Sequence, residues 1–401
     1  MQRAAIAAGV LCCLAVALDA FQTIILPRRP SGRLRITRLF YLITWHPLRA
    51  VASRVRNRRV REQLYSIYGP SSLILLLALW ALLLVVGFAL LYFALGSPFQ
   101  DAMARQRDLP WGRMGTDLYV SGTTLFTLGL GDVLPLDPAV RLLIIVESGV
   151  GLGFVALVIS YLPVLYQSFS RREVSIALLD ARAGSPPTAA ELLRRHGFEG
   201  GEVAMSELLA EWERWSAEIL ESHISYPLLC YYRSQHDNQS WLSALVAVLD
   251  SCALLITLTE GDATRQAQLT FAMARHALID LGHVFSLEQR TRELAERCPD
   301  RLPAEGFGRL CEALGETSLR VCGDPASMQR LRAMRALYEP QAMALAEYLR
   351  MPLPGWVPDP NAKDQWRNIE RLRREAAAVL EGTLPLSHHA TAAHLHDEPH
   401  H

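Results

Sequence analysis

The sequence lacks paired cysteines, has almost no lysine and carries none of the common enzyme signatures. Its seven cysteines include no Cys-x-x-Cys pair, which favours reduced thiols in the cytoplasm over disulfides or a zinc site. Lys363 is the only lysine, and the 40 basic residues are balanced by 40 acidic ones, unlike the charge of a nucleic-acid-binding protein. No nucleophile elbow, phosphate loop or His-Glu-x-x-His motif is present, which argues against an enzyme.

Apolar residues are abundant instead, and they gather in the first 170 residues. The chain is 51% hydrophobic with a mean hydropathy of +0.15. Runs over residues 1–27, 71–95 and 142–169 are each long enough to cross a bilayer. A cleaved signal peptide is the alternative for the first run, but its apolar character continues to Leu26, beyond the Ala-Leu-Asp-Ala segment where cleavage would occur.

The arginines predict the orientation of these runs. The segment 28–70 begins with eleven arginines and no acid between Arg28 and Arg61, and Arg171 and Arg172 follow the third run. The positive-inside rule places both groups in the cytoplasm, with the N-terminus outside, in a multi-pass protein of the bacterial inner membrane. Aromatic residues among the arginines predict a helix at the inner membrane surface, in contact with anionic lipids near Arg28–Arg61. A plain cytoplasmic loop is the alternative.

The link between the second and third runs holds the most informative pattern. Residues 116–126 are too short and polar to span, and they predict a helix whose carboxyl end favours a cation. Residues 127–132 then read Thr-Leu-Gly-Leu-Gly-Asp. Glycine accepts positive φ, so alternating glycines can turn successive carbonyl oxygens to one side. The segment resembles the Thr-Val-Gly-Tyr-Gly-Asp selectivity filter of the potassium channel superfamily.

The resemblance covers residues 71–170 and implies a pore domain in which four identical chains enclose one filter. It implies permeant K⁺ and no cofactor, with five filter residues: Thr127, Leu128, Gly129, Leu130 and Gly131. The carbonyls of the first four would hold the ion. Leu130 replaces the family's aromatic residue, which can brace the filter by a hydrogen bond. Because leucine cannot donate such a bond, the sequence does not decide whether the filter selects K⁺ over Na⁺.

Other residues are candidates for filter support and for gating. Asp132, Glu147 and Thr124 are expected to support the filter, with Glu147 accepting hydrogen bonds near the other two; simple closeness to the outer interface is its alternative. The candidates for a hinge or gate in the third run are Gly149, Gly151, Gly153, Tyr161 and Pro163. The glycines fit a hinge or close helix packing equally well, and the proline predicts a kink.

Beyond a linker at residues 171–187, the pattern becomes that of a helical cytoplasmic domain over 188–350. Apolar residues recur at helical spacing, and no dinucleotide-binding fingerprint accompanies them. The apolar run 241–260 carries acidic and serine residues in its middle, which favours a buried core helix over a fourth span. Residues 351–401 predict a Pro-rich connector, a terminal helix and a His-rich tail, the tail being disordered or a cloning remnant, or else a metal chelator.

These patterns predict an all-α membrane protein, in which a pore-loop tetrameric cation channel module precedes an all-α soluble cytoplasmic domain. The expected function is passive, potassium-selective conduction gated by the helical domain, whose own ligand cannot be read. A poorly selective cation channel and a non-conducting membrane sensor or scaffold with a vestigial pore are the alternatives. No span carries regularly spaced arginines, so steep voltage gating is not expected.

Overall fold

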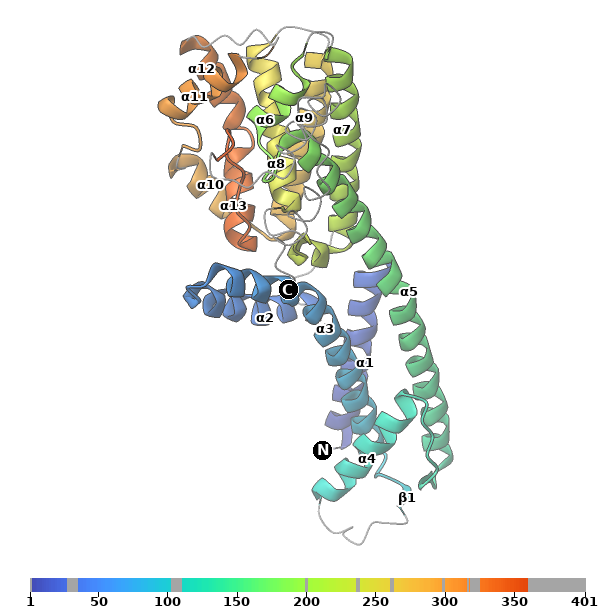
Figure 1. The fold of residues 1–401 in the computed structure, drawn as a ribbon. Coiled ribbons are helices and arrows are strands. Elements are labelled where there is room, and N and C mark those ends of the chain that lie inside the picture. Colours follow the sequence, from blue (N-terminus) through green and yellow to red (C-terminus); the bar gives the residue numbers. More distant parts are fainter. Residues whose placement is uncertain are drawn as a thin grey trace, which may run out of the picture.

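The computed structural model describes residues 2–26, 35–101, 110–198, 201–235, 239–259, 263–297, 300–315, 317 and 325–359. The predicted terminal helix and His-rich tail lie outside these residues, as do Cys298 and Cys322. The described chain is nearly all helical, with one two-stranded sheet, which confirms the predicted fold class. Figure 1 shows long helices below and a domain of shorter, packed helices above.

Three long apolar helices form the lower half. They are α1 (Gln2–Ala20, continued by the π-helical turn η1, Phe21–Ile25), α3 (Arg58–Ala94) and α5 (Pro138–Ala183), and each is long and apolar enough to cross a membrane. α1 packs against α3 through glycines, since a Cβ on Gly9 would lie 2.7 Å from the carbonyl oxygen of Gly87. Such small residues let helix backbones approach closely.

Two of these helices are longer than the spans predicted from hydropathy. α3 starts within the arginine-rich segment rather than at residue 71. α5 extends through most of the predicted linker 171–187 and ends only at Gly184, where φ is +83°. No glycine or proline interrupts residues 171–183, so nothing ends the helix before that point.

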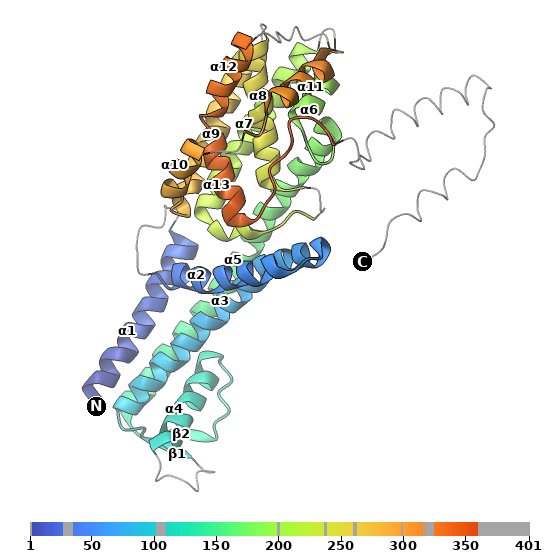
Figure 2. The same ribbon diagram turned by 90° about the vertical axis from the view of Figure 1, so that its left-hand side faces the viewer.

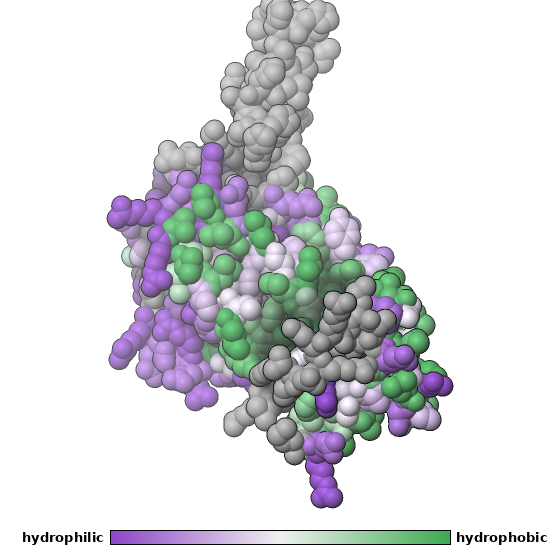
Figure 3. Space-filling view, turned by 90° about the horizontal axis from the view of Figure 1, so that it is seen from below, coloured by the Kyte–Doolittle hydropathy of each residue, from purple (hydrophilic) through white to green (hydrophobic). Residues whose placement is uncertain are grey.

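The arginine-rich segment forms a helical hairpin between the two halves of the molecule. α2 (Ile36–Arg54) lies beside the first turns of α3, and both run across the ends of the long helices (Figures 1 and 2). The hairpin exposes several large apolar side chains: Leu39, Ile43, Val51, Val60 and Ile67. Seen from below, the molecule shows a green apolar area bordered by purple hydrophilic residues (Figure 3).

The upper half is a helical domain built around one apolar helix. Its elements are α6 (Ala189–His196), α7 (Glu202–Ser225), η2 (Pro227–Tyr231), α8 (Trp241–Leu258), α9 (Ala263–Val284), α10 (Glu288–Arg297), α11 (Ala304–Gly315), α12 (Pro325–Arg335) and α13 (Glu339–Leu349). α8 is apolar enough for a span, yet protein buries nearly all of it. The structure therefore places this run in the core, as its central polar residues indicated.

An ionic network and the Pro-rich segment close this domain. Arg301 makes two hydrogen bonds to the buried Asp250, of 2.8 and 3.2 Å, and donates to the carbonyl oxygen of Pro354 at 2.8 Å. The ring of Trp356 is buried beneath the guanidinium of Arg301, 5.6 Å from its centroid. Residues 351–359 are therefore part of the domain, and the predicted boundary at residue 350 was wrong.

Candidate pore and filter

The predicted pore helix is present and longer than expected. α4 (Pro110–Leu125) starts ahead of the predicted 116–126, lies between α3 and α5, and follows the strand β1 (Phe99–Asp101). After the filter segment, β2 (Val133–Pro135) pairs antiparallel with β1. This sheet holds the two ends of the link together at the end of the molecule opposite the helical domain.

The carboxyl end of α4 closes with a Schellman motif. The amide of Leu128 donates to the carbonyl of Thr123 at 2.8 Å, and the amide of Thr127 donates to the carbonyl of Thr124 at 2.9 Å. Thr127 occupies the left-handed position of this motif with φ +57°. Thr124 thus supports the start of the filter segment through its backbone, since its carbonyl fixes the amide of Thr127.

Positive φ alternates along the filter segment. Thr127, Gly129 and Gly131 have φ values of +57°, +52° and +75°, whereas Leu128 and Leu130 do not have positive φ. Backbone that alternates between right- and left-handed conformations points successive peptide groups toward the same side. The two glycines thus adopt the conformation for which glycine is favoured.

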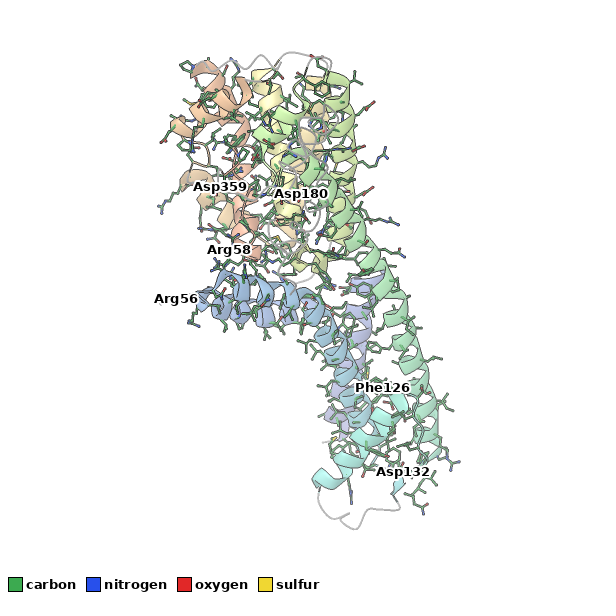
Figure 4. All side chains as sticks on the ribbon, in the orientation of Figure 1. Arg56, Arg58, Phe126, Asp132, Asp180 and Asp359 are labelled. Atoms are coloured by element: carbon green, nitrogen blue, oxygen red, sulfur yellow. The ribbon has the colours of Figure 1, made fainter. Side chains whose placement is uncertain are left out.

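The filter segment is open on the side away from α4. All residues from Phe126 to Asp132 are exposed in the single chain, and the leucine side chains at 128 and 130 are 62% and 63% exposed. Figure 4 shows Phe126 at the upper, carboxyl end of α4 and Asp132 near the lower end of α5. One chain provides only one wall here, so a closed ring of carbonyls requires further copies.

A tyrosine that sequence reasoning missed supports the outer end of the filter. The hydroxyl of Tyr119, on α4, donates to Oδ2 of Asp132 at 2.7 Å. This bond ties the last filter residue to the pore helix. The position of Leu130 offers no comparable bond because its side chain has no donor. The sequence signal for this bond was an aromatic residue with a hydroxyl group in the predicted pore helix, eight positions before Thr127.

Glu147 lies where three helices meet. It is fully buried on α5 and accepts hydrogen bonds from the hydroxyls of Tyr92 on α3 and Ser121 on α4. Glu147 was expected to accept hydrogen bonds near Asp132 or Thr124, and Ser121 lies one turn before Thr124 on α4; the bond from Tyr92 on α3 was not expected. Neither hydroxyl carried a sequence signal, because the three residues meet only through helix packing.

The three glycines of α5 differ in their surroundings. A Cβ on Gly151 would lie 2.0 Å from the carbonyl oxygen of Leu125, so α5 passes directly against the end of the pore helix. Gly149 and Gly153 have no such neighbour within 4 Å. α5 is continuous through all three. Gly151 therefore allows close packing of α5 against the end of α4.

The two deeper gate candidates lie at the junction with the helical domain. The ring of Tyr161 is buried and lies 5.6 Å from that of Tyr226, just before η2. Pro163 lies inside α5 without ending it. A few residues later Arg172 is buried, and its guanidinium donates to the carbonyls of Leu229 and Tyr232 at 2.9 and 3.0 Å. α5 thus reaches the domain as one helix anchored to η2.

Comparison with known proteins agrees with this geometry. Residues 79–167 match the sequence model of a family described as "Ion channel". The matched range runs from the second half of α3, through α4 and the filter, to the membrane half of α5. This part of the chain is therefore similar to an ion channel domain, and the long apolar helices on either side support a multi-pass membrane protein.

One relative is similar over most of the chain. It is the "Uncharacterized membrane protein YdjJ" of Bacillus subtilis (strain 168), 25% identical over 279 residues that make up 69% of this chain and 77% of the relative. No solved structure matches the chain.

Within the described residues, no group of His, Cys, Asp and Glu is arranged to hold a metal ion.

Proposed function

We propose that this protein is a potassium-selective channel in the inner membrane of a bacterium. Four chains surround one filter, and K⁺ passes without its water shell along the carbonyls of residues 127 to 130. The alternation of positive φ at Thr127, Gly129 and Gly131 carries this proposal. The matched ion channel domain supports conduction, and the exposed filter supports assembly around an axis.

The orientation follows from charge and from the position of the hairpin. Arginines of α2 and of the start of α3 lie between the long helices and the helical domain, so that domain faces the cytoplasm and the N-terminus lies outside. Leu39 and Ile43 lie one turn apart on α2 and are both exposed, which suits a helix that lies on the inner leaflet. Anionic lipids then meet the arginines between Arg28 and Arg61.

Gating by the helical domain follows from the continuity of α5. The same helix packs against the filter support at Glu147 and Gly151 and enters the core of the domain at Ile176 and Leu179, both fully buried. Because Arg172 fixes α5 to η2, a rearrangement of the domain would move the inner half of this helix. We propose that such movement opens and closes the inner end of the pore.

A poorly selective cation channel is the second candidate, because one observation favours it. Leu130 stands where an aromatic brace would be, and its side chain is 63% exposed in the single chain. The bond between Tyr119 and Asp132 supports only the outer end of the filter. A filter that can widen around Leu130 would discriminate less between K⁺ and Na⁺.

Ion flux into liposomes tests both candidates. The full-length protein is reconstituted, and flux is measured with K⁺ and then with Na⁺ as the permeant ion. Gly129→Ala places a side chain at φ +52°, where a non-glycine residue costs about 1–2 kcal/mol in each chain. The matched control is Gly122→Ala on α4, where φ is not positive and no atom lies within 4 Å of the added carbon.

We expect K⁺ flux that greatly exceeds Na⁺ flux, is lost in Gly129→Ala and persists in Gly122→Ala. Equal fluxes for the two ions would replace potassium selectivity with a general cation pathway. Flux that survives in Gly129→Ala at the wild-type level would remove residues 127–131 from the conduction path. Failure of both the full-length protein and a form without residues 188–401 to conduct would favour a sensor or scaffold.

A further inference from the structure

A cavity of about 500 Å³ lies where the membrane helices meet the helical domain. Its walls come from the end of α1, one face of α2, the turn η2 and the carboxyl end of α9. Cavities of this size hold small molecules or the polar part of a larger one. None of the filter residues lines it, so it is separate from the filter, although the gate candidate Tyr161 forms part of its wall.

The charge of the cavity is of one sign. Arg35, Arg38 and Arg49 line it from α2 and the residue before α2, together with His46. No aspartate or glutamate is among the lining residues in the part of the chain that the structure describes. An anion would therefore meet only positive or neutral groups there.

Two of these arginines have no charged or hydrogen-bonding partner among the described residues, so each can pair with a bound anion. Arg35 is engaged, since its guanidinium donates to Thr23 at 2.8 Å and lies 3.5 Å from Asp19. Arg38 and Arg49 form no ion pair or hydrogen bond with any other residue placed by the structure. They lie eleven positions apart, which places them on the same face of a helix of 3.6 residues per turn.

The same two arginines act on a neighbouring phenol. Burial raises the pKa of Tyr348, and the hydrogen bond with Tyr231 and the positive charges of Arg49 and Arg38 oppose that rise. Tyr348 lines the cavity from α13, in the helical domain. Both arginines are therefore near enough to this wall of the cavity to act on it electrostatically.

Part of the remaining wall is apolar, and the end of the first apolar stretch places the cavity near the membrane surface. Tyr41, Leu42 and Phe285 contribute to it, and Leu42 remains 42% exposed. Gln22 and Thr23 line the cavity near the end of a 24-residue apolar stretch. At 1.5 Å per residue such a stretch covers about 36 Å, against about 30 Å for the hydrocarbon core, so its last residues reach the headgroups.

We propose that this cavity binds the phosphate headgroup of an anionic phospholipid from the inner leaflet. Arg38 and Arg49 lie about 16 Å apart along α2, so one pairs with the phosphate and the other faces the hydroxyl groups of the headgroup. Leu42 and the aromatic wall contact the glycerol and the first methylene groups. The bound lipid then bridges α2 and the base of the helical domain, the same junction that α5 crosses. The choice of leaflet rests on the orientation given under the proposed function, but binding does not require conduction.

Lipid binding to the full-length protein in detergent tests this site. Phosphatidylglycerol is titrated against phosphatidylcholine, and bound lipids are counted by native mass spectrometry. The test variant is Arg38→Gln/Arg49→Gln. The control, Arg56→Gln/Arg58→Gln, removes the same charge at the far tip of the hairpin (Figure 4). We expect one tight phosphatidylglycerol per chain, bound at least tenfold more weakly by the test variant and within twofold of wild type by the control.

Three results would overturn the proposal. Equal weakening in both double variants would mean diffuse attraction to the hairpin, and equal binding of both lipids would mean that the anion is not recognised. Displacement of phosphatidylglycerol by glycerol 3-phosphate at similar concentration would mean a soluble ligand. If the test variant fails to fold, Leu42→Trp fills the cavity and keeps every charge, and we expect the same tenfold weakening. If the full-length protein binds phosphatidylglycerol as expected but conducts no ions, that result would count against the proposed channel and not against the lipid site.

Discussion

Replacing Glu147 by alanine should remove the polar bonds that join α5 to two neighbouring helices. The carboxylate is fully buried and is the acceptor for hydroxyls from Tyr92 on α3 and Ser121 on α4. Glu147→Ala removes both bonds at once and leaves a space where the carboxylate was. Only packing, as at Gly151, would then connect α4 to the helix that continues into the helical domain.

The expected loss of stability depends on whether each hydroxyl keeps a hydrogen-bond partner after Glu147 is replaced. Ser121 can still donate to the carbonyl oxygen of Val85, at 3.0 Å, so its hydroxyl keeps a partner. Tyr92 is fully buried, and its hydroxyl bonds only Glu147 among the described residues. An unsatisfied buried donor costs about 1–3 kcal/mol, and the lost side-chain packing adds to it. We expect a loss of about 3 kcal/mol per chain for Glu147→Ala and about 1–2 kcal/mol for Tyr92→Phe.

A double-mutant cycle measures the bond itself. Reversible unfolding in mixed micelles gives the free energy of unfolding for Glu147→Ala, Tyr92→Phe and the double variant. Because the two residues share one bond, their effects should fall short of additivity by about 1–2 kcal/mol. The control Ser160→Ala removes an exposed hydroxyl from the same helix and should change stability by less than about 0.5 kcal/mol. Additive effects of Glu147 and Tyr92 would refute the three-helix connection.

Two further predictions concern close packing and pH. Gly151→Ala places a carbon 2.0 Å from the carbonyl oxygen of Leu125, so it should lower flux several-fold and destabilise the protein by about 1–3 kcal/mol. The control Gly149→Ala adds a carbon that meets no atom within 4 Å, and it should conduct like wild type. Burial would raise the pKa of Glu191, but the arginines at 194 and 195 outweigh it and lower that pKa to about 2. Since this is below the ordinary value of about 4.3, the side chain stabilises the fold above that pH, and roughly 3 kcal/mol is lost as pH falls from about 4 to 2. Thermal melting of wild type and Glu191→Gln should converge over that interval, and a constant gap would contradict the assignment.

Much of the architecture followed from the sequence because it depends on local periodicity and transfer energy. Long apolar runs predicted the helices that now form α1, α3 and α5, although charge-rich ends extended two of them beyond the hydropathy signal. In α7 the apolar positions from Met205 to Ile219 are the buried ones. Alternating glycines implied the alternating φ of residues 127–131, since only backbone conformational freedom is involved.

The tertiary structure alone decided which side chains meet. The partners of Glu147, the burial of Tyr161 against Tyr226 and the close approach of Gly151 to α4 join residues that are distant in sequence. No periodicity encodes such contacts, because they depend on how helices cross and not on how each helix forms. The basic cavity is the same kind of feature. Sequence marked the arginines as cytoplasmic, but only packing separated the engaged Arg35 from its available neighbours on α2.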